Sequence, residues 1–463
     1  MSRLIVSLPP FLGTSGSDLV VGQEDNAIPA IGIEVLKNGV IDTQAGNDTI
    51  KGSGTGGDDS NAGGTGTGIA NSGIINAGSG DDTISGTGSG GSGYRSFQPG
   101  TGISNTQGGY INGGDGKDLI KGTGTGGGGN RAITIAIQNT QKSRIDGGFG
   151  DDSIEGTGIG VFEGNAIGIS NTQGSNINGG EGNDSIKGTG TGGISSTGGE
   201  GTGILNSGGS NINGDKGNDS IVGIGKGSDA SEEPFRSYNA GRGIGISNSK
   251  GSTIAVGQGN DYLSGTGTGG AGFYADDPFG QGPVALAAGV GIGIVNSGTI
   301  NLGDGNDTLI GTGISQGTGI LNTDGIIYQG AGADILTGYG ASVGIQGGTI
   351  DGGNGNDKFK ARRIDANGNT VSNQGGAIAD VLIKGGGGND IFDVGYGNAT
   401  LDGGSGSDKL ILSNFKSDYI ITGTGSPNNY TIKRDQFTLN VLNVEVITFS
   451  GVPLQQNVLG TVN

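Results

Sequence analysis

Thirteen aspartates recur along the chain in one local pattern, and each has a glycine two residues before it. The segment INGGEGNDSIKGTGTGG at 177–193 is representative, with Gly182 placed before Asp184. The thirteen are Asp18, Asp48, Asp82, Asp118, Asp152, Asp184, Asp219, Asp261, Asp307, Asp334, Asp357, Asp390 and Asp408. A carboxylate beside a glycine turn, whose carbonyl oxygens can converge, offers the hard oxygen ligands that calcium takes. The same aspartates could instead only cap their turns, which aspartate often does.

Apolar residues frame each aspartate at fixed distances. Two positions after it stand Val20, Ile50, Ile84, Ile120, Ile154, Ile186, Ile221, Leu263, Leu309, Leu336, Phe359, Phe392 and Leu410. Seven positions before it stand Phe11, Ile41, Ile75, Ile111, Ile145, Ile177, Ile212, Ile254, Ile300, Ile327, Ile350, Ile383 and Leu401. The pattern predicts two short strands, each with one side chain pointing inward, joined by a glycine turn. One such unit buries almost nothing, so we expect stacked coils with aliphatic ladders as their core.

Stacking the coils also stacks the aspartates. Neighbouring carboxylates would then lie about 5 Å apart, the spacing between strands of a sheet. Like charges at that distance repel unless a cation lies between them or the groups are neutralised. The sequence therefore predicts Ca²⁺ held by the turns, with a metal-free stack of neutralised aspartates as the alternative.

A second motif, G-T-G-I-x-N and its variants, fills the rest of each coil. It predicts another isoleucine ladder at Ile69, Ile103, Ile137, Ile169, Ile204, Ile246, Ile294 and Ile320. It also predicts an asparagine row at Asn71, Asn105, Asn139, Asn171, Asn206, Asn248, Asn296 and Asn322, interpreted as a turn-stabilising stack rather than a binding ladder.

Variation in coil length is concentrated on one edge. The distance from the motif isoleucine to the next aspartate is 13 to 15 residues, whereas that from the aspartate to the next isoleucine varies from 13 to 33. Insertions confined to one edge of a repeat protein mark loops on one face. Three of these loops, 93–99, 231–242 and 272–283, are rich in aromatic residues and either cover the solenoid edge or contact sugars or other molecules.

Threonines form a further row, which we expect to face outward by alternation from the inward isoleucines. It comprises Thr55, Thr87, Thr123, Thr157, Thr189, Thr266 and Thr312. Threonine suits a solvated strand. A flat array of this kind could also order water, so ice binding is an alternative function.

Composition excludes several classes of function. The chain has 463 residues, 112 glycines, no cysteine and no histidine, with a net charge of −19. Disulfides, thiol nucleophiles, cysteine-bound zinc and serine–histidine pairs are therefore unavailable. The acidic balance argues against nucleic acid as a partner. Since no apolar run reaches 18 residues, no membrane span is expected. We expect no enzymatic activity; the alternative is a polysaccharide-modifying enzyme that uses tyrosine, lysine or arginine on the solenoid face.

The nonapeptides at 113–121, 179–187 and 352–360 fit G-G-x-G-x-D-x-U-x at every position. They resemble the repeats-in-toxin (RTX) family, the haemolysin-type calcium-binding repeat, over roughly residues 10 to 411. The resemblance implies an all-β, right-handed parallel β-solenoid, similar to the RTX β-roll, with calcium between stacked turns. Tandem nonapeptides occur here only at 385–411, where Ala399 stands in place of an aspartate. Degenerate turns at Asp18, Asp48, Asp219 and Asp334 predict weaker sites.

The sequence divides into an N-terminal cap with a degenerate first repeat (1–30), a calcium-binding solenoid (31–411) and a C-terminal β cap (412–463). The last segment has alternating apolar residues that predict strands. It resembles the region that follows RTX arrays, which implies an uncleaved type I secretion signal. The chain as a whole resembles glycine-rich bacterial surface and matrix proteins, cyanobacterial ones among them. We therefore expect a secreted structural or adhesive protein at the cell surface or in the matrix, with itself or other surface components as partners.

Overall fold

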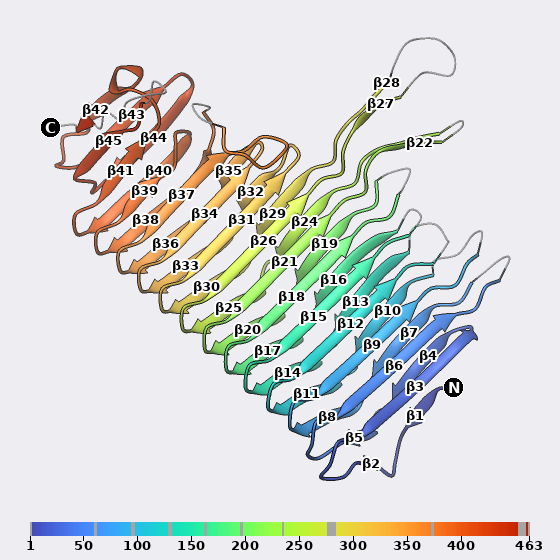
Figure 1. Cartoon of the computed structure of the whole chain (residues 1–463). Coiled ribbons are helices and arrows are strands. Elements are labelled where there is room, and N and C mark those ends of the chain that lie inside the picture. The colour runs from blue at the N-terminus through green and yellow to red at the C-terminus, as the bar shows by residue number, and fades with distance from the viewer. Residues whose placement is uncertain are drawn as a thin grey trace.

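The structure is a computed structural model of the chain. It describes residues 2–59, 63–93, 98–127, 132–161, 164–194, 198–233, 236–275, 284–371, 375–451 and 460–461. Most coils consist of three strands, and equivalent strands of successive coils lie side by side along the length of the molecule (Figure 1).

The three strands of a coil form three rows. The first row comprises β1 (Leu4–Val6), β4 (Ala30–Val35), β7 (Gly66–Asn71), β10 (Gly100–Asn105), β13 (Ile133–Asn139), β16 (Asn165–Asn171), β19 (Gly201–Asn206), β24 (Gly243–Asn248), β29 (Gly291–Asn296), β32 (Thr318–Asn322) and β35 (Val343–Gln346). The second comprises β2 (Phe11–Leu12), β5 (Val40–Asp42), β8 (Ile74–Ser79), β11 (Tyr110–Asp115), β14 (Arg144–Phe149), β17 (Asn176–Glu181), β20 (Asn211–Lys216), β25 (Thr253–Gln258), β30 (Thr299–Asp304), β33 (Ile326–Ala331), β36 (Thr349–Asn354) and β40 (Asn398–Ser405). The third comprises β3 (Leu19–Ala27), β6 (Thr49–Gly56), β9 (Thr83–Ser89), β12 (Leu119–Thr125), β15 (Ser153–Ile159), β18 (Ser185–Thr191), β21 (Ser220–Lys226), β26 (Tyr262–Thr268), β31 (Thr308–Ile314), β34 (Ile335–Gly340), β37 (Lys358–Arg363), β39 (Ile391–Asp393) and β41 (Lys409–Leu412).

Every row pairs in parallel and in register, so like residues face like residues. Ile111 aligns with Ile145 and then with Ile177, and the third-row isoleucines align in the same way. The long strand β38 (Ile378–Gly387) pairs with both β35 and β36 and so joins the first two rows. The result is one 27-stranded and one 15-stranded sheet. The expected all-β parallel solenoid is confirmed.

The core consists of the predicted aliphatic ladders, with one exception. The isoleucines of the three rows are almost completely buried and form one continuous cluster along the stack. Phe11, expected to point inward, is instead 38% exposed. It lies on the two-residue strand β2, which has only β5 as a partner.

Glycine is needed next to the buried isoleucines, because the backbones of the first and third rows approach each other closely there. A Cβ built on Gly188 would lie 2.2 Å from the carbonyl oxygen of Gly203. The turn glycine Gly182 has φ of +145°, and a Cβ there would lie 1.9 Å from the carbonyl oxygen of Gly150. The composition that would favour disorder in an irregular chain is therefore what allows these coils to pack.

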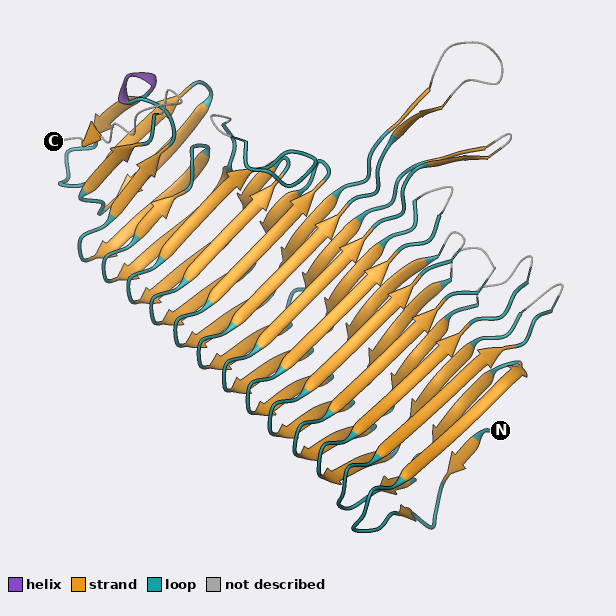
Figure 2. Ribbon diagram, viewed as in Figure 1, coloured by secondary structure: helices purple, strands orange, loops and turns teal. Residues whose placement is uncertain are grey.

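The insertions lie on one edge, as predicted, between a third-row strand and the next first-row strand. Two of them contain antiparallel hairpins, β22 (Ser231–Glu233) with β23 (Arg236–Tyr238) and β27 (Phe273–Ala275) with β28 (Val284–Leu286). Both hairpins extend away from the stacked coils (Figure 2). Their described backbone therefore does not cover the solenoid edge. Residues 94–97, 234–235 and 276–283 of the aromatic loops lie outside the described residues.

The C-terminal segment ends the stack with antiparallel strands. After the 3-10 helix η1 (Lys416–Asp418) come β42 (Ile420–Gly423), β43 (Tyr430–Arg434) and β44 (Phe437–Leu442), which form an antiparallel meander. β44 pairs with β40, and β45 (Val446–Phe449) pairs with β41, so the segment also continues two rows of the solenoid. β46 (Gly460–Thr461) pairs antiparallel with β45. In the described part of the chain, no helix has the length and apolarity needed to cross a membrane.

The threonine row requires one correction. Thr87, Thr123, Thr157 and Thr189 align as predicted on the outer surface of the third row, where Thr87 is exposed and the other three are half-buried. The residue aligned with Thr87 in the preceding coil is Ser53. Thr55 aligns instead with Ser89, two positions further along the same strands. Ile224 also interrupts the threonine row, between Thr189 and Thr266.

Candidate metal centre: a ladder of buried aspartates

The recurring aspartates form a hydrogen-bonded ladder at the turn between the second and third rows. The backbone N–H of Asp152 donates to Oδ1 of Asp184 at 2.8 Å, and the N–H of Asp184 donates to Oδ1 of Asp219 at 2.7 Å. The same bond links every consecutive pair from Asp18 to Asp408, at 2.6 to 2.9 Å. Each carboxylate from Asp48 onward thus satisfies a backbone donor of the preceding coil, which is a form of the turn-capping role considered from the sequence.

The second carboxylate oxygen has no such partner. Oδ2 is buried and accepts no hydrogen bond from any described residue in Asp48, Asp82, Asp118, Asp152, Asp184, Asp219, Asp261, Asp307, Asp334, Asp357, Asp390 and Asp408. A buried, unpaired charge is costly, so it must be matched by a cation or removed by a proton. Twelve such atoms lie in one row, so the same charge problem recurs in twelve successive coils.

Asp18 differs from the other twelve. Its Oδ2 accepts the backbone N–H of Thr14 at 2.6 Å, and its side chain is only partly buried. Asp18 therefore caps its own turn. Asp334, whose turn is degenerate in sequence, lies fully within the ladder and is completely buried. Degeneracy of the turn thus does not remove an aspartate from the ladder.

The first glycine of the nonapeptide leaves the point beside Oδ2 without a side chain. A Cβ built on Gly179 would lie 2.6 Å from Oδ2 of Asp184 and 2.8 Å from the carbonyl oxygen of Gly214 in the next coil. A carboxylate oxygen and a carbonyl oxygen therefore border the same point. Among the twelve aspartates with an unpartnered Oδ2, the glycines at this position are Gly113, Gly147, Gly179, Gly214, Gly352, Gly385 and Gly403, beside Asp118, Asp152, Asp184, Asp219, Asp357, Asp390 and Asp408; Gly13 stands in the same place beside Asp18.

In five coils a buried side chain occupies that glycine position. The residues are Thr43, Ala77, Val256, Leu302 and Gln329, five positions before Asp48, Asp82, Asp261, Asp307 and Asp334. Of the four degenerate turns, those of Asp48 and Asp334 belong to this group, whereas that of Asp219 keeps the glycine, Gly214. The ladder is thus continuous, but the row of glycines beside it is not.

Burial shifts the ladder toward its protonated form. Desolvation, opposed by the accepted N–H bond, raises the pKa of Asp118, Asp152, Asp219, Asp307 and Asp357 to about 7. It raises the pKa of Asp82, Asp184, Asp334 and Asp390 to about 6. Neighbouring carboxylates raise the pKa of most of these groups further. Near neutral pH the ladder would therefore share its charge with protons unless a cation were bound.

A second ladder, which sequence reasoning missed, runs beside the first on the exposed side of the turn. Where the residue before a ladder aspartate is Asn or Asp, its side-chain oxygen accepts the backbone N–H of the corresponding residue one coil later in nine coils. Asn183, for example, accepts from Asn218 at 2.8 Å. The acceptors are Asn47, Asp81, Asp151, Asn183, Asn218, Asn260, Asn306, Asn356 and Asn389. The repeated Asn-Asp pair in the sequence was the available signal.

The predicted asparagine row is a structural stack. Each Nδ2 from Asn71 to Asn296 donates to Oδ1 of the next asparagine at 2.8 to 3.0 Å, and the row is buried. The same amide nitrogen also bonds a backbone carbonyl of the next coil, such as that of Asn211 for Asn171, at 2.8 Å. With its polar atoms used internally, the row joins coils and offers no accessible binding surface.

The residues of the aspartate ladder fit a hard cation. Calcium takes roughly six to eight oxygen ligands with flexible geometry, and the point beside each first glycine is bordered by one carboxylate and one carbonyl oxygen. Each ion would therefore need further oxygen ligands from the turns. Comparison of the chain with family models and with curated proteins found no match.

Proposed function

We propose that the protein is a calcium-binding structural or adhesive protein of the cell surface or extracellular matrix, whose fold depends on the ion at neutral pH. The observation that supports this is the row of twelve buried carboxylate oxygens without a partner. Charge in such a row is tolerable only if cations or protons offset it. Calcium is the cation whose ligand preferences match carboxylate and carbonyl oxygens.

The coils that have a glycine beside the unpartnered Oδ2 are the preferred calcium sites. Their aspartates, from Asp118 to Asp219 and from Asp357 to Asp408, fall into two blocks. The intervening coils of Asp261, Asp307 and Asp334 have Val256, Leu302 and Gln329 beside the carboxylate. In this proposal calcium contributes folding free energy, since the binding sites form only when coils stack.

A structural role is supported by the arrangement of the coils and of the inserted hairpins. The described coils repeat one cross-section, and the inserted hairpins β22–β23 and β27–β28 extend from a single edge (Figure 2). Projections on one edge of a rigid rod suit contact with other copies or with surface and matrix components. Membership of the haemolysin-type calcium-binding repeat family, secretion by a type I pathway and the absence of enzymatic activity belong to the same proposal.

Calcium removal tests the proposal. Far-UV circular dichroism at pH 8 should show loss of β signal in chelator and its return on adding calcium, and magnesium should restore it poorly. Sedimentation of the refolded protein would then detect self-association. An unchanged β signal in chelator at pH 8 and low protein concentration would contradict calcium-dependent folding.

A further inference from the structure

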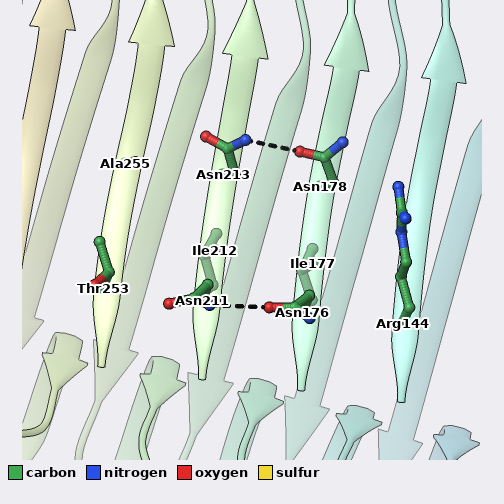
Figure 3. A pocket seen from close by; sticks show the side chains of 9 residues that line it. All are labelled: Arg144, Asn176, Ile177, Asn178, Asn211, Ile212, Asn213, Thr253 and Ala255. Atoms are coloured by element: carbon green, nitrogen blue, oxygen red, sulfur yellow. Dashed lines mark hydrogen bonds between the residues drawn. The ribbon is translucent and has the colours of Figure 1, made fainter. Parts of the chain in front are cut away.

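A shallow groove lies on the outer face of the second row, across β14, β17, β20 and β25. Its volume is about 450 Å³, and its polar lining comprises Arg144, Asn176, Asn178, Asn211, Asn213 and Thr253 (Figure 3). Ile145, Ile177 and Ile212 of the same strands are buried, so the intervening residues face outward by strand alternation. The groove is separate from the aspartate ladder, whose carboxylates are buried at the turn.

The amides in the groove are held in two ordered rows. Nδ2 of Asn211 donates to Oδ1 of Asn176, and Nδ2 of Asn213 donates to Oδ1 of Asn178, both at 3.0 Å (Figure 3). An amide group has two N–H donors and two acceptor positions, so one bond to its neighbour leaves donors and acceptors for a ligand. Successive amides are spaced by one strand, about 4.8 Å. The groove therefore presents a preorganised alternation of donors and acceptors.

One end of the groove is bounded by a fixed but neutralised cation. Arg144 pairs with the buried carboxylate of Asp146, and its guanidinium lies over the ring of Tyr110, 5.6 Å from the centroid. Oδ1 of Asp146 also accepts a hydrogen bond from Asn178 at 3.1 Å. The groove thus has no unpaired charge among its polar lining residues, while the chain as a whole carries −19. An acidic polymer would be repelled by that net charge, and an uncharged one would not.

We propose that this groove binds a segment of an uncharged polysaccharide. Sugar hydroxyls both donate and accept hydrogen bonds, which is what paired amides offer, and Arg144 adds donors at one end. The inference adds a ligand to the proposed structural role and does not depend on where calcium binds.

Two matched double variants test the groove. Asn176→Ala with Asn211→Ala removes one amide row from it. Asn76→Ala with Asn112→Ala removes the same kind of amide pair, joined at 2.8 Å, from strands β8 and β11 outside it. Binding would be measured by calorimetry in calcium with linear glucan, mannan, galactan and xylan oligosaccharides and with a uronate polymer, after circular dichroism has verified folding.

We expect at least one neutral oligosaccharide to bind, with affinity reduced about tenfold or more in the groove variant and unchanged in the matched control. Loss of two amide contacts, each worth about one neutral hydrogen bond, corresponds to that reduction. Absence of neutral-glycan binding, binding of the uronate polymer alone, or equal loss in both double variants would each overturn the proposal.

Discussion

Replacing Asp184 by asparagine and by alanine separates the two roles of a ladder aspartate. In the wild type, the N–H of Asp152 lies 2.8 Å from Oδ1 of Asp184. Asparagine keeps an oxygen that can accept this N–H but removes the charge. Alanine removes both. A buried N–H left without an acceptor costs about 1–3 kcal/mol. The alanine variant should therefore be less stable than the asparagine variant by that amount, whatever ion is present.

The negative charge of Asp184 has a separate free-energy cost, which follows from its pKa. Burial raises the pKa of Asp184 from 3.8 to about 6, and one pKa unit corresponds to about 1.4 kcal/mol, so the ionised group costs at most about 3 kcal/mol above pH 6. In chelator at pH 5, where the wild-type carboxyl is largely protonated, the asparagine variant should match the wild type. In calcium at pH 8 both variants should lose stability around Asp152, Asp184 and Asp219, because a cation ligand is gone.

Hydrogen exchange with mass spectrometry can follow these coils separately from the rest. A difference of 1–3 kcal/mol changes local exchange by roughly 5- to 150-fold. Distant coils should be unaffected, because each coil contacts only its neighbours. If the asparagine variant in calcium at pH 8 were as protected as the wild type, the carboxylate would not be a cation ligand. If it exchanged as fast as the alanine variant under every condition, the N–H acceptor role would be wrong.

Four further outcomes follow from the same features. In chelator, the free energy of unfolding should fall as pH rises from about 4 to 7 and stay low above pH 7, because carboxyls whose folded pKa is raised to about 6–7 favour the fold only while protonated. Calcium should abolish this dependence. A pH series of urea unfolding with and without calcium would show both results. Gly179→Ala should lower the calorimetric stoichiometry by one calcium ion, because its methyl group would lie 2.6 Å from Oδ2 of Asp184. In the control, Ala77→Gly should leave the stoichiometry unchanged or raise it. Asn171→Ala should cost about 2 kcal/mol or more, because it removes the buried hydrogen bonds that Asn171 accepts from Asn139 and donates to Asn206 and to the carbonyl of Asn211. Asn112→Ala on the surface should change the unfolding free energy by less than about 0.5 kcal/mol. Replacing residues 272–283 by a short glycine linker should preserve the circular dichroism spectrum in calcium and weaken self-association measured by sedimentation; failure to fold would contradict a role outside the core.

The sequence was most informative where periodicity is strict. Isoleucine, asparagine and aspartate recur at distances that admit only a stacked arrangement, so the rows and their inward faces could be predicted. The sequence was less informative where the position or burial of a side chain depends on how its strand pairs with the neighbouring coil. Thr55 matches its expected row in type but lies two residues beyond Ser53, and Phe11 has the right spacing on a strand too short to bury it. For Thr55 the pairing register decides the position, and for Phe11 the length of the strand does, although Phe11 pairs in register with Ile41.

The candidate site shows the same limit. The aspartates were evident, but the direction of their hydrogen bonds was not, because nothing in one coil specifies whether a carboxylate accepts from the coil before or after. The role of the first glycine was likewise hidden. Position 179 appears in sequence as one of many turn glycines, whereas in the structure it lies on a strand and leaves the point beside Oδ2 of Asp184 without a side chain.

The direction of the aspartate ladder has a consequence for the order in which the coils can be completed. The N–H of each ladder aspartate is satisfied only by the carboxylate of the following coil, and the last of the array, Asp408, donates to Oε2 of Glu445 at 2.7 Å. Glu445 lies between β44 and β45, the two strands that join the C-terminal segment to the stack. A segment emerging from the ribosome therefore always ends in a coil whose turn amide awaits a carboxylate not yet synthesised. The C-terminal segment supplies this acceptor from outside the repeat, so the turn amide of the last coil is satisfied only once that segment has folded onto the stack.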